Sequence, residues 1–297
     1  MYLLSTTPGP ETDFNIFYER QANEGLVHSG LMHGHRFDIA EQYNEDWATP
    51  VIAWSAGGEE AYHLQGTKTI TLRSAGALII AAGARYAYAA SPEYIFRSNM
   101  ISFPHWIVRE AARDPLDPAH ERASRLETAL FFPDAQTQSL MDTIAARCAA
   151  RVVDATWYAE QVALLYARLL DAQHRRAAAR DALKACKRST RAELARRVDR
   201  AQEYMLEQFH DPSLTLGEIA RTACLSQFHL IRVFKTVTGA TPMRRLSAIR
   251  MQAARRLTGH TQKSIKEIAA AVGYSDRTAF FKAFKAAYGV APTAIDK

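Results

Sequence analysis

The sequence is short of cysteine and has no long apolar run. Its 297 residues contain three cysteines, Cys148, Cys186 and Cys224, which are odd in number and scattered, so they indicate neither a disulfide framework nor a zinc motif. No stretch of 18 or more apolar residues occurs, which argues against a membrane span. The opening residues, MYLLSTTPGPETD, lack a basic segment followed by an apolar one, so no signal peptide is expected. We therefore expect reduced cysteines in a cytoplasmic protein.

Negative charge is scarce in the C-terminal part of the chain. Residues 181–297 contain 21 Lys and Arg against 10 Asp and Glu, a net charge of +11. Residues 1–180 contain 16 against 21, a net charge of −5, and the two parts together account for the overall charge of +6. This asymmetry points to an anionic partner for the C-terminal part alone. A solvated basic helical face is the alternative, and charge by itself does not distinguish the two.

Residues 1–110 contain many short runs of β-forming residues. TKTITLR (67–73), ALIIAA (77–82) and EYIFRSNMISF (93–103) are rich in Ile, Thr, Tyr and Phe, and glycine-containing breaks separate them. Many short strands at this spacing predict a barrel or sandwich rather than a parallel sheet. Pro115 and Pro118 end the pattern, because proline interrupts both strands and helices.

An alanine-rich helical region follows, with one helix expected within 135–150 and a longer one from about Asp154. The longer helix carries one apolar stripe, at spacing i, i+4, i+7 and i+11, widened by a tryptophan. The stripe residues are Trp157, Tyr158, Val162, Leu165 and Leu169. Such a stripe packs either on the chain's own barrel or on the same helix of a second subunit, and we favour pairing in a homodimer. Residues 173–193 are charged and lack a stripe, so we interpret them as the connection between domains.

Two stretches of the C-terminal part share one skeleton. GEIARTACLSQFHLIRVFK (217–235) and KEIAAAVGYSDRTAFFKAFK (266–285) each contain Glu-Ile-Ala, a short gap, a serine, and an apolar and basic run that ends on Phe-Lys. Each stretch predicts a short helix, a turn, and a second helix capped by Ser226 or Ser275. Gly273 lies in the second turn, where a positive φ is often needed, and Cys224 holds that place in the first. The duplication predicts helix-turn-helix units near 214–237 and 264–287.

The segment between the two units predicts a rigid linker. TPMRRLSAIRMQAARRL (241–257) opens with Thr241 as a cap and Pro242 at the first helical position. It should form one helix of about 15 residues, or roughly 23 Å. A rod of that length can hold two recognition helices about one DNA turn apart, roughly 34 Å. Both helices would then enter successive major grooves on one face of the duplex.

Residues from about 200 to 297 resemble the DNA-binding domain of AraC/XylS-type transcriptional regulators. The resemblance is carried by SQFHLIRVFKTVTGATP (226–242), IRMQAARRL (249–257), SIKEIAAAVGYSD (264–276) and FFKAFKAAYGVAP (280–292). Cys224 stands where the family has a turn glycine, Arg245 where it has an aromatic residue, and Ala291 where it has threonine. The resemblance implies a sequence-specific regulator whose partners are double-stranded promoter DNA and RNA polymerase.

The resemblance also implies that the outer faces of the two recognition helices bind DNA. Arg232 and Arg277 can bind guanine O6 and N7, and Phe228 can contact a thymine methyl group. Neighbouring basic side chains, such as Arg221 and Lys266, are better suited to phosphate, which positions the protein. The predicted DNA-binding residues are Ser226, Gln227, Phe228, Ile231, Arg232 and Lys235 in the first unit and Asp276, Arg277, Thr278, Phe281, Lys282 and Lys285 in the second. For Phe281, packing within the domain is the alternative.

Many proteins of this family have an N-terminal cupin-like β-barrel that binds an effector, followed by helices that dimerise. HLQGTKTITLRSAGALIIAAGARYAY (63–88) is similar to the core of such a barrel. The expected architecture is therefore a two-domain α+β protein. It has a cupin-like barrel at 1–110, a helical dimerisation and linker region at 111–185, and an all-α DNA-binding domain at 186–297.

The N-terminal part offers a candidate effector pocket. His33 and His35, followed by Glu41, resemble the His-x-His pattern of metal-binding cupins, but a third histidine expected near residue 86 is missing. We therefore expect no metal and no cofactor, and instead a pocket of aromatic and polar side chains for a small-molecule effector. The candidates are His33, His35, Trp54, Tyr62, Arg85, Tyr86, Tyr88 and Arg97. Arg85 or Arg97 would favour a carboxylate or phosphate, and a filled core is the alternative.

Together these patterns predict a non-enzymatic regulator whose promoter binding responds to a small-molecule effector. One alternative is a constitutive DNA-binding regulator with a structural barrel. The other is a metal-dependent cupin enzyme fused to a DNA-binding domain, which would need more metal ligands than the sequence offers. No catalytic residues are predicted.

Overall fold

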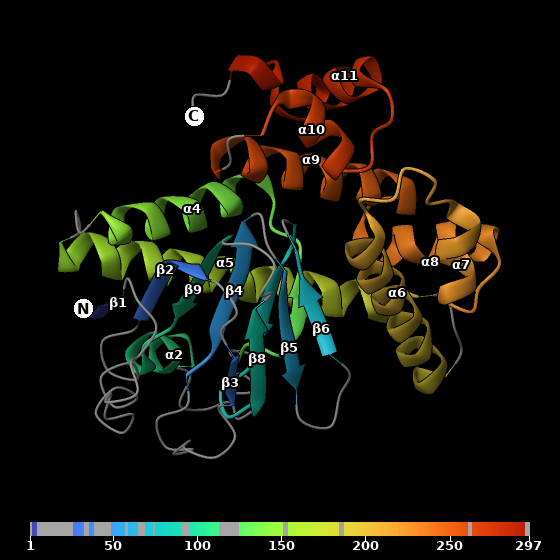
Figure 1. The fold of residues 1–297 in the computed structure, drawn as a ribbon. Coiled ribbons are helices and arrows are strands. Elements are labelled where there is room, and N and C mark those ends of the chain that lie inside the picture. Colours follow the sequence, from blue (N-terminus) through green and yellow to red (C-terminus); the bar gives the residue numbers. More distant parts are fainter. Residues whose placement is uncertain are drawn as a thin grey trace. The chain divides into compact units, whose positions relative to one another are not determined.

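The computed structural model forms two compact units (Figure 1). The N-terminal unit comprises Met1–Ile70 and Ala77–His174, and the C-terminal unit comprises Thr71–Gly76 and Arg175–Lys297. The helices that follow the strands therefore group with them as far as His174. The structure describes residues 2–4, 26–32, 36–38, 49–56, 59–64, 69–73, 75–90, 96–112, 125–150, 154–183, 187–260 and 263–294.

The described strands form two sheets, as the β-rich pattern of residues 1–110 predicts. The larger sheet has the order β1-β2-β9-β4-β7-β10 and the smaller one β3-β8-β5-β6. The strand bounds are β1 Tyr2–Leu4, β2 Leu26–Met32, β3 Arg36–Asp38, β4 Val51–Ala56, β5 Glu60–Leu64, β6 Thr69–Leu72, β7 Ala77–Ile80, β8 Tyr86–Ala90, β9 Phe96–Ser102 and β10 Ala129–Phe131. In the described part no pairing joins the two sheets into one closed barrel. The cupin-like barrel stays a prediction.

The larger sheet has two faces of different character, because successive side chains of a strand point to opposite sides. In β4, Ile52 and Trp54 belong to the main apolar core. Ile52 is paired with Ile79 of β7 and with Ile101 of β9, which therefore share its face. Val51, Ala53 and Ser55 of β4 point to the other side.

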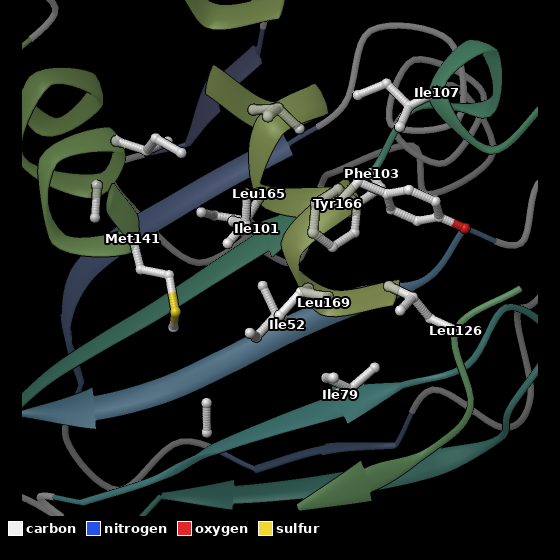
Figure 2. Close-up of a cluster of buried hydrophobic side chains, with 14 of the residues drawn as sticks. Ile52, Ile79, Ile101, Phe103, Ile107, Leu126, Met141, Leu165, Tyr166 and Leu169 are labelled. Carbon is white, nitrogen blue, oxygen red and sulfur yellow. The ribbon is translucent and has the colours of Figure 1, made fainter. Parts of the chain in front are cut away.

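Helices α2 (His105–Ala111), α4 (Ala135–Ala149) and α5 (Ala155–Asp181) contribute to this core. Figure 2 shows Leu165, Tyr166 and Leu169 of α5 lying over the sheet residues Ile52 and Ile101. The ring of Tyr166 meets that of Phe103 nearly edge to face, with centroids 5.1 Å apart. The two predicted helices are thus found where their sequence patterns lie.

The position of the α5 stripe corrects its predicted role as a subunit interface. Tyr158, Val162, Leu165 and Leu169 are all buried in the core of the N-terminal unit. Trp157 is half-buried, and the Arg147 guanidinium lies 4.5 Å from the centre of its ring. The stripe therefore packs on the chain's own sheet, which was the alternative reading. A homodimer remains a prediction but needs another surface.

Residues 173–193 are mostly helical, and the boundary between the two compact units falls within them, at His174 and Arg175. Helix α5 continues to Asp181, and α6 (Arg188–Gln208) begins seven residues later. Alanine and arginine have high helix propensity, which stabilises these turns without a continuous apolar stripe. An ion pair between Arg176 and Asp199 joins the end of α5 to α6.

The C-terminal unit is helical from α6 onward, as predicted. Its other helices are α7 Leu216–Thr222, α8 Gln227–Thr238, α9 Pro242–His260, α10 Ile265–Ala271 and α11 Arg277–Tyr288, followed by a 3-10 turn at Pro292–Ala294. The predicted linker helix is α9, which runs three residues past its expected end. In the same unit Gly76 donates its backbone N–H to Gln252 and accepts from the buried Arg256. No helix of the described part is both long and apolar enough to span a bilayer.

Truncating the α5 stripe should destabilise the N-terminal unit. Leu165 is fully buried, whereas its neighbour Leu164 is 45% exposed. Leu165→Ala should lower the free energy of unfolding by about 2–5 kcal/mol, because it leaves a cavity in the core. Leu164→Ala, the matched control, should change it by less than about 0.5 kcal/mol. Urea unfolding of the full chain followed by circular dichroism measures both, and equal effects would remove Leu165 from the core.

Candidate nucleic-acid interface

Both helix-turn-helix units begin with the same capping arrangement. Thr215 caps α7 and Ser264 caps α10, each accepting a hydrogen bond from the backbone N–H three residues later. Glu218 and Glu267 complete the two capping boxes by accepting from the backbone of the cap residue at 2.8 and 2.7 Å. Hydrogen bonds from the backbone and hydroxyl of Thr215 lower the pKa of Glu218, and those from the hydroxyl and backbone of Ser264 lower the pKa of Glu267. The glutamate of the repeated Glu-Ile-Ala therefore completes a capping box, which the Ser/Thr-x-x-Glu pattern could have predicted.

The two turns differ in length by one residue. Glu218 and Glu267 are 49 positions apart, but Phe234 and Phe284 are 50 apart, so the second turn holds the extra residue. Ser226 caps α8 as predicted, accepting from the N–H of His229 at 3.3 Å.

The extra residue also corrects the predicted cap of α11. Asp276, not Ser275, is the N-cap, and it accepts from the N–H groups of Thr278 and Ala279 at 3.0 and 2.9 Å. These hydrogen bonds, that from Ala279 first, lower the pKa of Asp276.

The turn position that Gly273 and Cys224 share requires a left-handed backbone. Gly273 has φ of 80° and Cys224 has φ of 52°, the only positive value among the non-glycine residues of the described part. The carbonyl of Cys224 accepts a hydrogen bond from Arg197 of α6 at 3.0 Å. The predicted equivalence of the two turns is therefore confirmed, and the first accommodates a side chain where the second has none.

The second helix of each unit has a buried face and an exposed face. Leu230, Val233, Phe234 and Val237 of α8 are buried, as are Phe280 and Phe284 of α11. The predicted DNA-binding residues lie on the opposite side. The exposed ones are Ser226, Gln227, Phe228, Ile231, Arg232, Lys235, Asp276, Arg277, Thr278, Lys282 and Lys285. The structure thus brings each predicted set together on one outer face, and their contacts with DNA stay a prediction.

Phe281 is the one predicted contact that is half-buried. Its ring meets that of the buried Phe280 at 6.1 Å, with the planes nearly perpendicular. The Arg277 guanidinium lies 5.1 Å from the centre of the Phe281 ring, within the range of a cation–π interaction. Phe281 therefore packs inward and supports Arg277 on its outer side.

Arg250 of the linker helix α9 connects the backbone that follows α6 with the second turn, and sequence reasoning did not identify it. Its guanidinium donates to the backbone carbonyls of Phe209 and Asp211 at 2.8 and 2.7 Å. It also lies 5.6 Å from the centre of the Tyr274 ring in the second turn. A Cβ on Gly273 would come within 2.5 Å of the Phe209 carbonyl oxygen and 2.9 Å of Arg250. Glycine is thus required there for its missing side chain as well as for its φ.

A second polar cluster lies in the N-terminal unit. The buried Glu60 of β5 accepts a hydrogen bond from the hydroxyl of Tyr62 at 2.9 Å. The Tyr62 ring lies 5.2 Å from that of Tyr88 and 6.0 Å from that of Tyr86. Burial, followed by the charge of Glu60, raises the pKa of Tyr62 and of Tyr88. Tyr88 also hydrogen-bonds Ser98 of β9, so the cluster lies between the two sheets.

The structure brings together only part of the predicted effector pocket. Tyr62, Tyr86 and Tyr88 converge, and Glu60 joins them from the same face of β5, which strand alternation could have indicated. Trp54 is a correction, because it points into the apolar core on the opposite face of β4 from Ser55, whose partner across the strands is Ser98.

The remaining predicted pocket residues are not placed in the cluster. Arg85 is exposed just before β8. Arg97 lies in β9, but its side chain falls outside the described part. His33 and His35 also fall outside the described residues. Within those residues no three His, Cys, Asp or Glu side chains form a group that could hold a metal ion, and the absence of a metal stays a prediction.

The sequence comparisons with known proteins concern about a third of the chain. Residues 219–297 match the family model described as a helix-turn-helix domain. The chain is 31% identical over 97 residues to the MmsAB operon regulatory protein of Pseudomonas aeruginosa, covering 33% of this chain and 31% of that protein. It is 32% identical over 88 residues to the transcriptional regulator ArgR of the same organism, covering 30% and 27%. The chain spans about a third of the length of these curated relatives.

Two solved structures are also similar to parts of this chain. The C-terminal domain of AraT, a response regulator from Geobacillus stearothermophilus, is 37% identical and covers 33% of this chain and 80% of its own, with a TM-score of 0.32. Fatty-acid-bound ToxT from Vibrio cholerae is 12% identical and covers 90% and 93%, with a TM-score of 0.37. The C-terminal domain is therefore similar to the helix-turn-helix domains of transcriptional regulators.

Adding a methyl group at Gly273 should destabilise the C-terminal unit. Gly239, at the end of α8, has φ of 75° and nothing within 4 Å of an added Cβ, so it is a matched control. Both alanine variants should lose about 1–2 kcal/mol through the left-handed backbone. Gly273→Ala should lose a further 1–3 kcal/mol or so, because its Cβ collides with a backbone carbonyl. Thermal unfolding of both variants measures the difference, and equal melting temperatures would contradict the collision.

Proposed function

We propose that the protein is a sequence-specific DNA-binding transcriptional regulator. The proposal rests mainly on the two helix-turn-helix motifs of the C-terminal part of the chain. The second helix of each motif has an exposed polar and basic face. The net charge of +11 for residues 181–297 suits an anionic partner. The names of the relatives support this function, since they describe an operon regulatory protein and a transcriptional regulator.

In this proposal α8 and α11 enter successive major grooves of one duplex. Helix α9, which joins them, has 19 residues and a length of about 28 Å, comparable to the roughly 34 Å of one DNA turn. Exposed cations beside the helices, including Arg221, Arg244 and Lys266, contact phosphates and set the register of the protein on the duplex. The base edges are read by the outer faces of the recognition helices.

In vitro selection with the full-length protein tests this arrangement. Random duplexes should be enriched for two blocks of conserved bases whose centres are about 10–10.5 base pairs apart. Arg277→Ala should then weaken binding by about 1–3 kcal/mol and relax the preference at one base position. Leu164→Ala, which is remote from both helices along the chain, is the control and should bind as the unchanged protein does.

Two results would contradict the proposal at different levels. A library that shows no enrichment contradicts sequence-specific binding. Enrichment followed by a uniform loss of affinity in Arg277→Ala, with base preferences unchanged, would reassign Arg277 to a phosphate.

The N-terminal unit is proposed to bind a small-molecule effector that shifts the protein between DNA-binding states. The tyrosines around Glu60 are the proposed contact site, because they place hydroxyl groups and a carboxylate between two sheets. A carboxylate only accepts hydrogen bonds, so the site favours a ligand rich in donors, such as an amine or a polyol, over an anion. This reverses the preference predicted from Arg85 and Arg97. A structural barrel with constitutive DNA binding is the second candidate function, supported by the close packing of the tyrosine rings.

Thermal unfolding of the full chain with amines, sugars, carboxylates and nucleotides tests the effector proposal. A ligand at about 100 times its dissociation constant adds about 2.7 kcal/mol of stability. Glu60→Gln, which keeps the shape but removes the charge, should abolish the shift for an amine, and Leu164→Ala should retain it. A shift that survives Glu60→Gln would place the ligand elsewhere, and no shift across the panel would favour the structural barrel.

The remaining partners follow from the same proposal. The protein acts as a homodimer at promoters together with RNA polymerase in the cytoplasm, and it is not an enzyme. The family resemblance supports these assignments, and the buried α5 stripe means that the dimer uses a different surface. One relative, AdaA of Bacillus subtilis, is described as a bifunctional transcriptional activator and DNA repair enzyme and is 33% identical over 95 residues. A metal-dependent enzyme is not proposed for this chain.

A further inference from the structure

The two recognition helices have the same length but expose different chemistry. Both α8 and α11 contain 12 residues and follow a capping residue, so their positions correspond one to one. Phe228 of α8 corresponds to Thr278 of α11, and Gln227 corresponds to Arg277. At these positions α8 therefore presents an aromatic ring and an amide, whereas α11 presents a hydroxyl and a cation.

Helix α8 exposes two apolar side chains next to basic ones. The side chain of Phe228 is 77% exposed and that of Ile231 is 37% exposed. They are three residues apart and so lie on one side of the helix. Arg232 and Lys235, on the same helix, are exposed cations. Apolar side chains within a positive surface suit the major groove of a duplex, where each thymine displays a methyl group beside the phosphates.

Helix α11 instead holds an arginine against an aromatic ring. The Arg277 guanidinium lies 5.1 Å from the ring centre of Phe281, one turn further along the helix. Phe281 is itself held by its contact with the buried Phe280. Stacking restricts the guanidinium before it binds, which suits its planar donors to two acceptors in fixed geometry. At the corresponding positions α8 has Gln227 and Ile231, so it lacks this pairing of an arginine with an aromatic ring.

We infer that the two units read different base chemistry. Helix α8 recognises thymine methyl groups through Phe228 and Ile231, and α11 recognises a guanine through Arg277. Phe281 is a positioning residue that acts through Arg277. The inference rests on the proposed function and adds the chemical class of the operator: a thymine-containing half and a guanine-containing half about one helical turn apart.

Uracil substitution in the selected duplex tests the α8 half, because uracil differs from thymine only by the missing methyl group. Replacing a contacted thymine in the α8 block should weaken binding of the full-length protein about fourfold, the loss expected for one buried methyl group. In Phe228→Ala the same replacement should have no further effect. Uracil in the α11 block is the control and should leave affinity unchanged.

Replacing guanine by 7-deazaguanine tests the α11 half, because it removes the N7 acceptor. The unchanged protein should lose about tenfold in affinity, within the range for a bidentate pair, whereas Arg277→Ala should be indifferent. Phe281→Leu should lose much of this discrimination, and Phe281→Tyr, which keeps a ring, should retain it. Arg232→Ala is the matched control, and it should weaken binding equally to both duplexes.

The outcomes distinguish a failure of this inference from a failure of the proposed DNA-binding function. Failure to select any duplex would overturn both. A selected duplex insensitive to uracil at every thymine of the α8 block would overturn the methyl reading while the regulator function stands. Full 7-deazaguanine discrimination in Phe281→Leu, even at lower overall affinity, would show that Phe281 is only structural and would overturn its positioning role.

Discussion

Arg250 is the contact on which the arrangement of the C-terminal unit depends. It lies in the linker helix, and its two hydrogen bonds reach the backbone that follows α6, while its guanidinium faces Tyr274 in the second turn. These contacts tie the helix before the first unit to the turn of the second. They are possible only because Gly273 has no side chain to fill the space beside the Phe209 carbonyl. One arginine and one glycine therefore fix how the linker helix meets the end of α6 and the turn of the second helix-turn-helix unit.

The duplicated units keep the same internal structure and differ on their surface. Each has a capping box at its first helix, a left-handed turn residue, and buried aromatic or aliphatic side chains in its second helix. These features decide whether the helices form and pack, so they constrain the repeat. The outer faces have no part in that packing, so Phe228 can stand where the second unit has Thr278. Folding and the proposed base recognition thus depend largely on separate sets of residues.

In the N-terminal unit, strand alternation separates an apolar core from a polar cluster. Trp54 and Ser55 are adjacent in β4 but face opposite sides of the sheet, toward the helices and toward the second sheet respectively. Glu60 joins the tyrosines because it shares a face of β5 with Tyr62. A buried carboxylate is costly unless hydrogen-bonded, and the hydroxyl of Tyr62 supplies one such bond. The same strands therefore build an apolar core on one side and a hydrogen-bonded polar cluster on the other.

The local features of this protein were determined by its sequence. The β-rich start, the two helix-turn-helix units, the Ser226 cap, the linker helix and the special backbone of Cys224 and Gly273 follow from short-range patterns, because caps, turns and helical periodicity depend on nearby residues. Only the tertiary structure decided that the α5 stripe packs on its own sheet, that Trp54 leaves the pocket, and that Arg250 reaches Phe209, 41 positions away. An apolar stripe has the same pattern whether it meets its own chain or another. Its partner is chosen by long-range packing, which no local pattern encodes.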